Sequence, residues 1–308
     1  MWSLEQIKAI KKLVVEAIFS DDTLMEQLVL KGGNAIDLVY GLSERASMDL
    51  DFSIPGRFEV GQMAEIETRL KKTLDKTFKR EGFVIFDFNF SEKPRQMPPD
   101  LEDFWGGYKV EFKFITEEKY RRSTKDTQVL VQDPQTLVRQ AERIFGAQTS
   151  PIIKIDISKY EFCEPKVPHD FEDYTIYVYT PAMLVFEKLR ALCQQTDAYQ
   201  KVIGTDITKA RARDFYDIYI LMQTQGIDTQ SEANQKLLKR IFDCKKARLS
   251  VDELLKKKEI HAQDFESVRA TLRPDAAQNL KDFDFYFSFV IETFGFLETL
   301  WNEETPSI

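Results

Sequence analysis

Residues 31–53 read KGGNAIDLVYGLSERASMDLDFS and decide the fold that we expect. The apolar run LVL leads into Lys31 and the pair Gly32–Gly33, and NAIDLVY follows, which is the pattern of a strand, a tight turn and the start of a helix. A glycine turn lets the backbone approach a ligand, and a helix start presents unpaired N–H groups to an anion. The stretch therefore predicts a phosphate-binding turn.

Two aspartates stand near the end of this stretch. In MDLDFS, Asp49 and Asp51 are separated by Leu50, so on a strand both carboxylates would face one side, while Leu50 and Phe52 would face the core. Mg²⁺ prefers oxygen ligands and is commonly held by one or two carboxylates together with substrate phosphates. In a chain with 51 acidic residues, such a pair is often only a solvated pair. Its position after the glycine turn favours a nucleotide and metal site.

The composition is that of a packed globular protein with one large or two ordinary domains: 308 residues, of which 43% are hydrophobic. The apolar runs are shorter than the ~18 residues of a membrane span, and the first residues lack a signal-type core, so we expect a cytoplasmic protein. Cys163, Cys193 and Cys244 are far apart and predict neither a disulfide framework nor a zinc site. The isolated His169 and His261 predict no metal site.

The net charge of −8 argues against a large nonspecific nucleic-acid footprint. Local basic clusters still permit contact with an RNA end, although such runs are usually solvated helix faces. These clusters are Lys119, Arg121, Arg122 and Lys125; Lys209, Arg211 and Arg213; and Lys239, Arg240, Lys245, Lys246 and Arg248.

The pattern along the chain predicts an α+β protein. Ser3 and Gln6 match a capping box at the start of a helix over 3–20, and further helices are expected over 59–81 and about 134–146. Strands are expected over 82–90, 108–115, 152–158 and 174–180. Pro181 marks a change to helical sequence, which ends in a phenylalanine-rich helix over 277–302 that we expect to serve in packing or in binding a partner. We therefore expect domains over 1–180 and 181–308.

Two further acids are candidates for a third metal-binding carboxylate. Asp156 lies in the strand IIKIDIS and Glu111 in YKVEFKFI. Each is also compatible with an exposed acid on a strand face, whereas a two-ion site needs a third carboxylate beside the first pair. The sequence pattern leaves the choice between them open.

The helical half contains charged residues that local pattern treats as structural. Lys188 in PAMLVFEKLRAL lies at the edge of an apolar face, where a lysine usually extends to water. Asp214 and Asp217 share one helix face in KARARDFYDIYILMQ and are expected to form salt bridges with Arg211 and Arg213.

Four segments together resemble a known family. KGGNAIDLVYGLSERASMDLDFS, IKIDIS, FEKLRAL and RARDFYDIYIL are similar to the four successive motifs of the AbiEii/AbiGii-type nucleotidyltransferase toxins, over about residues 28–222. That family belongs to the DNA polymerase β-like nucleotidyltransferase superfamily. The resemblance implies a polymerase β-like domain over 1–180, with a mixed sheet flanked by helices, and an all-helical domain over 181–308 that completes the active-site cleft.

The resemblance also implies roles for individual residues. Gly32 and Gly33 would form the triphosphate-binding turn, and Lys188 would face the phosphates, which reverses its structural interpretation. The wider superfamily has Gly-Ser in this turn, so Gly33 is a departure that leaves only backbone N–H groups for the phosphate. The remaining implied roles are Asp49, Asp51 and Asp156 as ligands of Mg²⁺ or Mn²⁺, Asp214 as a motif acid, and Arg45 and Ser47 as nucleotide contacts.

The implied activity is metal-dependent transfer of NMP from an NTP to an acceptor hydroxyl, with a tRNA 3′ end as the first candidate. The chain would be a toxin of a toxin–antitoxin or phage-defence system, with a cognate antitoxin as partner. Two alternatives stay open. The acceptor could be a protein or small-molecule hydroxyl, or the chain could be a degenerate transferase that serves as a non-catalytic binding module.

Overall fold

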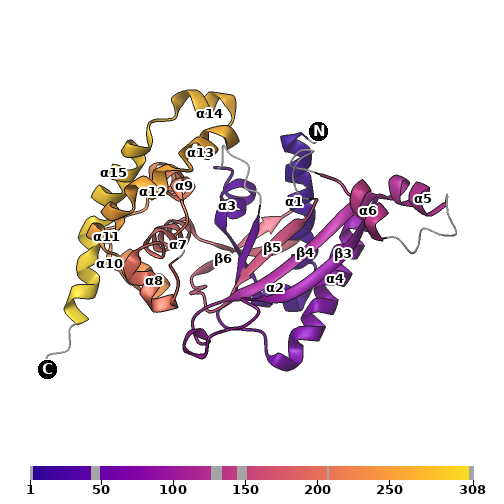
Figure 1. Ribbon diagram of the computed structural model, residues 1–308, viewed down its shortest axis with the longest axis horizontal. Helices are drawn as coiled ribbons and strands as arrows, with labels where there is room; N and C mark the ends of the chain where they lie inside the picture. The colour runs from indigo at the N-terminus through magenta and orange to yellow at the C-terminus, as the bar shows by residue number, and fades with distance from the viewer. Residues whose placement is uncertain (1–2, 43–48, 126–133, 144–150, 207, 305–308) are drawn as a thin grey trace.

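A mixed sheet with flanking helices is followed by a region that is entirely helical in the part of the chain that the structure describes (Figure 1). The structure is a computed structural model, and it describes residues 3–42, 49–125, 134–143, 151–206 and 208–304. This arrangement confirms the predicted α+β class.

The N-terminal helix covers one face of the sheet. Helix α1 (Leu4–Phe19) begins with the predicted capping box, in which the Ser3 hydroxyl accepts a hydrogen bond from the Gln6 N–H. Val14 and Ile18 on its apolar stripe are fully buried, and each such burial stabilises the fold by about 1.5–3 kcal/mol. Helix α1 is followed by α2 (Asp22–Gln27) and packs against α4 (Met63–Arg80).

Seven strands form the sheet in the order β3-β4-β5-β2-β1-β7-β6. The pairs β2–β5 and β1–β7 are parallel and the other four are antiparallel. Strands β2 and β5, which carry Asp51 and Asp156, are thus neighbours near the middle of the sheet. The strands are β1 (Val29–Lys31), β2 (Leu50–Ser53), β3 (Phe83–Lys93), β4 (Gly107–Thr116), β5 (Ile153–Ser158), β6 (Lys166–Phe171) and β7 (Tyr174–Tyr179).

Alternation along β2 and β5 follows the prediction. Leu50 and Phe52 are buried, with Phe52 at 6.1 Å from the ring of Phe19 in α1, and the isoleucines of β5 are buried as well. Asp51 and Asp156 lie between these buried positions, and the parallel register places them directly beside each other. Both carboxylates therefore point away from α1, since side chains alternate between the two faces of a sheet.

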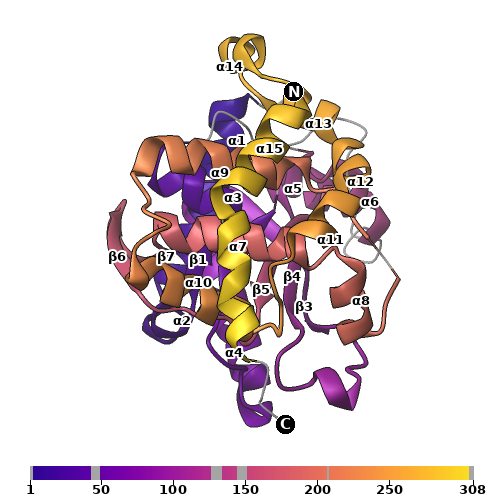
Figure 2. The same cartoon turned by 90° about the vertical axis from the view of Figure 1, so that its left-hand side faces the viewer.

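The helical region begins immediately after the last strand. Thr180 caps α7 and Pro181 occupies its first turn, as the sequence predicts. In Figure 2 the helices of this region lie in front of the sheet. They are α7 (Pro181–Cys193), α8 (Asp197–Ile203), α9 (Ala212–Gln225), α10 (Glu232–Asp243), α11 (Val251–Lys256), α12 (Lys258–Ala262), α13 (Phe265–Thr271), α14 (Pro274–Asn279), α15 (Phe283–Phe294) and the 3₁₀ segment Gly295–Glu304.

The structure adds one strand to the predicted elements and corrects one predicted helix. Strand β6 contains Pro168 and was not predicted; it lies at the edge of the sheet, where a missing N–H is tolerated. The helix predicted over 277–302 is interrupted, because Leu280 is extended and Asp282 caps a new helix, α15. Its phenylalanines do pack inside the protein, for example Phe283 and Phe287 against Phe215.

The remaining elements lie close to the predicted ones. Strands β3 and β4 start within one residue of the predicted positions, and a short helix α5 (Glu117–Lys125) follows β4. Helix α6 (Pro134–Gln140) starts where predicted but ends earlier than predicted, since the described residues 141–143 are not helical; Gly146 itself lies outside the described residues.

The buried apolar side chains form one continuous group that runs from α1 through the sheet to the last helices. The division into domains at residue 180 therefore stays a prediction. All three cysteines are free, and none of the described helices has both the length and the apolarity that crossing a membrane requires.

Candidate active site

The glycine turn is built tightly against Asp51. Strand β1 ends at Lys31, and the chain turns directly into α3 (Gly32–Asn34) and a π-helical segment (Ala35–Val39). Gly32 has a φ of +67°, and a Cβ atom there would lie 2.5 Å from Asp51 Oδ2. Only glycine fits this position, because it tolerates left-handed backbone and leaves room for the carboxylate.

The same turn holds the start of β2. The side chain of Asn34 is fully buried, and its amide donates a hydrogen bond to the backbone carbonyl of Asp49. Asp49 precedes β2 and its side chain is exposed. The turn thus holds the backbone of Asp49 and lies directly against the side chain of Asp51, the two predicted metal-binding aspartates.

The third carboxylate comes from β5. Asp156 lines the same cavity as Asp49 and Asp51, and its side chain forms an ion pair with Lys93 at 3.5 Å. Glu111, the competing candidate, is ion-paired with Lys109 on its own strand at 2.6 Å and is not among the residues that line this cavity. The geometry favours Asp156, whose metal-binding role stays a prediction.

Two helices supply the opposite wall. Lys188 on α7 is buried and forms ion pairs with Asp214 at 3.0 Å and Asp217 at 2.7 Å, both on α9. Arg211 reaches the second oxygen of Asp214 at 2.8 Å. Burial alone would raise the pKa of Asp214, but the two cations outweigh it and hold the pKa below its ordinary value.

These contacts test the structural interpretation of the helical residues, whereas their roles toward a nucleotide stay predictions. The predicted salt bridge between Arg211 and Asp214 is confirmed, whereas Arg213 contacts Ser267. Lys188 does not extend to water, which corrects the interpretation from its local pattern. Its side chain is only 7% exposed, because the two carboxylates of α9 satisfy its charge inside the protein.

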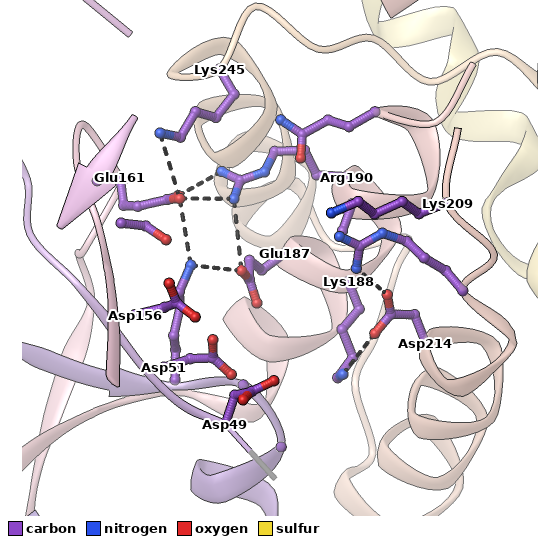
Figure 3. A pocket seen from close by; sticks show the side chains of 18 of the residues that line it. Asp49, Asp51, Asp156, Glu161, Glu187, Lys188, Arg190, Lys209, Asp214 and Lys245 are labelled. Carbon is purple, nitrogen blue, oxygen red and sulfur yellow. Dashed lines mark hydrogen bonds and ion pairs between the residues drawn. The ribbon is translucent and has the colours of Figure 1, made fainter. Parts of the chain in front are cut away.

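A buried ion network joins the sheet to the helical region (Figure 3). We define it as Lys31, Glu161, Glu187, Arg190 and Lys245. Glu161 accepts two hydrogen bonds from Arg190, at 2.7 and 3.1 Å, and lies 3.5 Å from Lys31 and 3.6 Å from Lys245. Lys31 also contacts Glu187 at 2.8 Å. Burial would raise the pKa of Glu161, but the three cations overcome this and keep the carboxyl ionised.

Both walls and the ion network line one cavity of about 920 Å³. Its lining includes Gly32 and Gly33, the three aspartates, Lys188 and Asp214, so the structure brings these sequence-predicted residues together. Arg45 and Ser47 lie outside the described residues. The sequence pattern did not indicate the following lining residues as functional: Lys31, Lys93, Trp105, Glu161, Glu187, Arg190, Gln194 and Asp264.

The acids of the sheet suit a hard divalent cation in their chemistry. Burial raises the pKa of Asp51 to about 7; Lys31 opposes this rise, and the carboxylates of Glu187, Asp156 and Asp49 add to it. An added cation would relieve this excess of negative charge, and oxygen donors are what Mg²⁺ prefers. Within the described ranges, however, no three acidic, His or Cys side chains already form a group that could hold an ion.

Comparison with known proteins gives one family. The model of the nucleotidyl transferase AbiEii toxins of type IV toxin–antitoxin systems matches residues 13–288. The search of curated proteins found no similar sequence.

Two solved structures of similar fold share low sequence identity with this chain. JHP933 from Helicobacter pylori is 17% identical, with a TM-score of 0.47, over 100% of this chain and 97% of that one. MenT4, a nucleotidyltransferase toxin from Mycobacterium tuberculosis, is 16% identical, with a TM-score of 0.43, over 94% of this chain and 82% of that one. These similarities are too low to assign a role to any residue.

Proposed function

Because this chain belongs to the family of AbiEii nucleotidyl transferase toxins of type IV toxin–antitoxin systems, we propose that it transfers NMP from an NTP to an acceptor hydroxyl, with a tRNA 3′ end as the first candidate. An antitoxin partner follows from the type of system. The observation that carries the proposal is the parallel register of Asp51 and Asp156, with Gly32 packed against Asp51.

In the proposed reaction, the acceptor hydroxyl attacks the α-phosphorus of the NTP. A bond forms between the hydroxyl oxygen and this phosphorus, the bond to the β-phosphate oxygen breaks, and pyrophosphate leaves. Asp156, which is 32% exposed at its side chain, is our candidate to accept the hydroxyl proton.

Asp49, Asp51 and Asp156 would hold the divalent cation. When bound, the cation supplies positive charge that stabilises the attacking and leaving oxygens. Magnesium is the first candidate because the donor set consists of carboxylates.

The helical wall would hold the phosphates. Lys188 is a compact cation at the cavity, and Asp214 fixes its position while also holding Arg211. Asp217 supports Lys188 from the next turn of α9. Two cations are thus positioned at one edge of the cavity before any phosphate arrives, which is the preorganisation that phosphoryl transfer requires.

The test incubates the purified protein with each α-labelled NTP and a total tRNA pool. We expect label on RNA, and we expect the double variant Asp49→Ala, Asp51→Ala to lose it. Label on protein would support a protein hydroxyl as acceptor, and no transfer together with no NTP binding by calorimetry would support a binding module.

Single variants decide the third carboxylate. Asp156→Ala should abolish transfer, whereas Glu111→Ala on the adjacent strand serves as a matched control and should retain it. The reverse result would reassign the role to Glu111.

A further inference from the structure

Helix α7 also lines a part of the cavity that lies beyond Lys188, the residue that we propose to face the phosphates. Glu187, Lys188 and Ala191 line the cavity at the spacing of residues on one helix face, and so does Gln194, the cap residue that follows the last turn of α7. Gln194 lies six residues after Lys188, or about 9 Å along the helix axis. The small side chain of Ala191 lies between them, so α7 leaves room there for a flat ligand group.

The amide of Gln194 is held in one orientation. Its Nε2 donates to the Tyr199 hydroxyl at 2.9 Å, and that hydroxyl donates to the backbone carbonyl of Lys245 at 2.9 Å. A carbonyl can only accept, so the Tyr199 proton is committed to it, and the phenolic oxygen can only accept from the Gln194 amide. This order assigns Nε2 and Oε1. Within the described residues, Oε1 and the second Nε2 proton have no other hydrogen-bond partner, so they can serve a ligand.

Trp105 also packs against Tyr199. It is half-buried, lines the cavity, and its ring lies 6.1 Å from that of Tyr199. The Lys245 ammonium donates to the carbonyl of the preceding Phe104 at 3.1 Å. The next residue in the sequence after Trp105 is Gly106, which has a φ of +97°. The indole is therefore an aromatic surface on a fixed segment.

We infer that Trp105 and Gln194 form a nucleobase subsite, in which the base stacks on the indole and presents its edge to the Gln194 amide. The inference rests on the proposed nucleotidyl transfer and adds the recognition of the base. An aromatic ring stacks on any base, and a glutamine amide offers both a donor and an acceptor to a base edge. Tyr199 is a positioning residue, because it orients Gln194 without lining the cavity.

The base could belong to the NTP or to the last nucleotide of an RNA acceptor. One arm of the experiment measures kcat and KM for each of the four NTPs with a fixed acceptor. The other arm uses one NTP with acceptors that differ only in the 3′-terminal base. Whichever arm responds to the variants identifies the source of the base.

Four variants test the subsite. Gln194→Glu replaces the donor by a second acceptor and should change the ratio of kcat/KM between bases by about 10-fold. Trp105→Ala should raise KM about 10-fold for all bases, and Trp105→Phe should restore most of that loss because a ring remains. Tyr199→Phe should reduce the ratio of kcat/KM between the preferred base and the other bases, with little change in kcat for the preferred base.

Inorganic tripolyphosphate is the matched probe that has no base. Its inhibition of the reaction should be the same in the wild-type protein and in Gln194→Glu and Trp105→Ala. The subsite is refuted if Gln194→Glu lowers kcat/KM equally for every base in both arms, or if Gln194→Glu and Trp105→Ala weaken inhibition by tripolyphosphate as much as they weaken the use of nucleotides. If the wild-type protein transfers label from no NTP, the proposed function itself fails.

Discussion

Two charged regions line the same cavity and differ in how their charges are balanced. The acidic wall, which consists of Asp49, Asp51 and Asp156, gathers carboxylates, and burial, with a smaller contribution from their mutual repulsion, raises the pKa of Asp51 to about 7. The ion network pairs each buried carboxylate with at least one buried cation. An unbalanced group gains most from a bound cation, whereas a balanced one holds structural elements together. The first region is therefore suited to binding and the second to rigidity.

The largest effect is expected at the glycine turn that supports the acidic wall. Gly32→Ala should lower kcat/KM for nucleotide transfer by about 10³-fold, because its Cβ would occupy the position of the Asp51 carboxylate. Gly41→Ala is the matched control: its φ of +64° causes the same backbone strain, but no atom of the residues that the structure describes lies within 4 Å of the added Cβ. Equal activity losses in the two variants would mean that the space that Gly32 leaves for the Asp51 carboxylate is not important for transfer.

A smaller effect, on stability, is expected from the ion network. Glu161→Gln leaves Lys31, Arg190 and Lys245 without their common partner, and we expect the free energy of unfolding in urea to fall by about 3–5 kcal/mol. Glu232→Gln, which removes an exposed ion pair with Lys236, should produce no measurable change. An equally small change in the free energy of unfolding for both variants would mean that the ion network does not stabilise the fold.

His261 shows a third way to bury a titratable group, which is to keep it neutral. Its ring is fully buried 5.3 Å from Phe215, and its nitrogens have no hydrogen-bond partner within the described residues. Burial lowers the pKa of His261 from 6.5 to about 4. The unfolded state therefore binds more protons between pH 4 and 6.5, and stability falls as the pH drops through this window.

The variant His261→Leu isolates this contribution. The stability of the wild-type protein relative to the variant should be constant above pH 6.5 and should fall by about 3 kcal/mol as the pH approaches 4. Urea unfolding at a series of pH values measures it. Parallel curves for the two proteins would mean that His261 has the same pKa in the folded and the unfolded state.

The smallest effect concerns Lys93, an exposed cation at the edge of the acidic wall. Its side chain is 65% exposed and pairs with Asp156 at 3.5 Å, so it competes only weakly with a divalent cation. Lys93→Met should lower the Mg²⁺ concentration for half-maximal transfer by about 2-fold, with a difference that shrinks at high salt. Lys109→Met is the control. It removes an ammonium that pairs with Glu111 and should leave the Mg²⁺ concentration for half-maximal transfer unchanged.

Much of the acidic wall could be predicted because its pattern is local. Alternation of Asp51 with Leu50 and Phe52 identifies the exposed face of a strand before any fold is known, and the same holds for Asp156 between its isoleucines. The capping box at Ser3 and the helix start at Pro181 are local in the same sense. The family motifs added Lys188 and Asp214, whose local surroundings alone indicate ordinary surface charges.

The ion network could not be predicted, because its members are far apart in the sequence. Lys31 and Glu187 are separated by 156 positions, and Glu161 and Lys245 come from two further segments. Each residue alone is typical of a solvated charge. Strand β6 was missed for a related reason, since an edge strand with a proline lacks the usual pattern and is defined by its partner β7.

The sequence by itself determined the class of the fold, the faces of the strands that carry the aspartates, and the family. These depend on periodicity and on short motifs, which operate over a few residues. Only the tertiary structure decided that Asp51 lies beside Asp156, that Gly32 packs against the Asp51 carboxylate, and that Gln194 and Trp105 meet around Tyr199. Register and side-chain contacts between distant segments depend on how the whole core packs, and no local pattern specifies them.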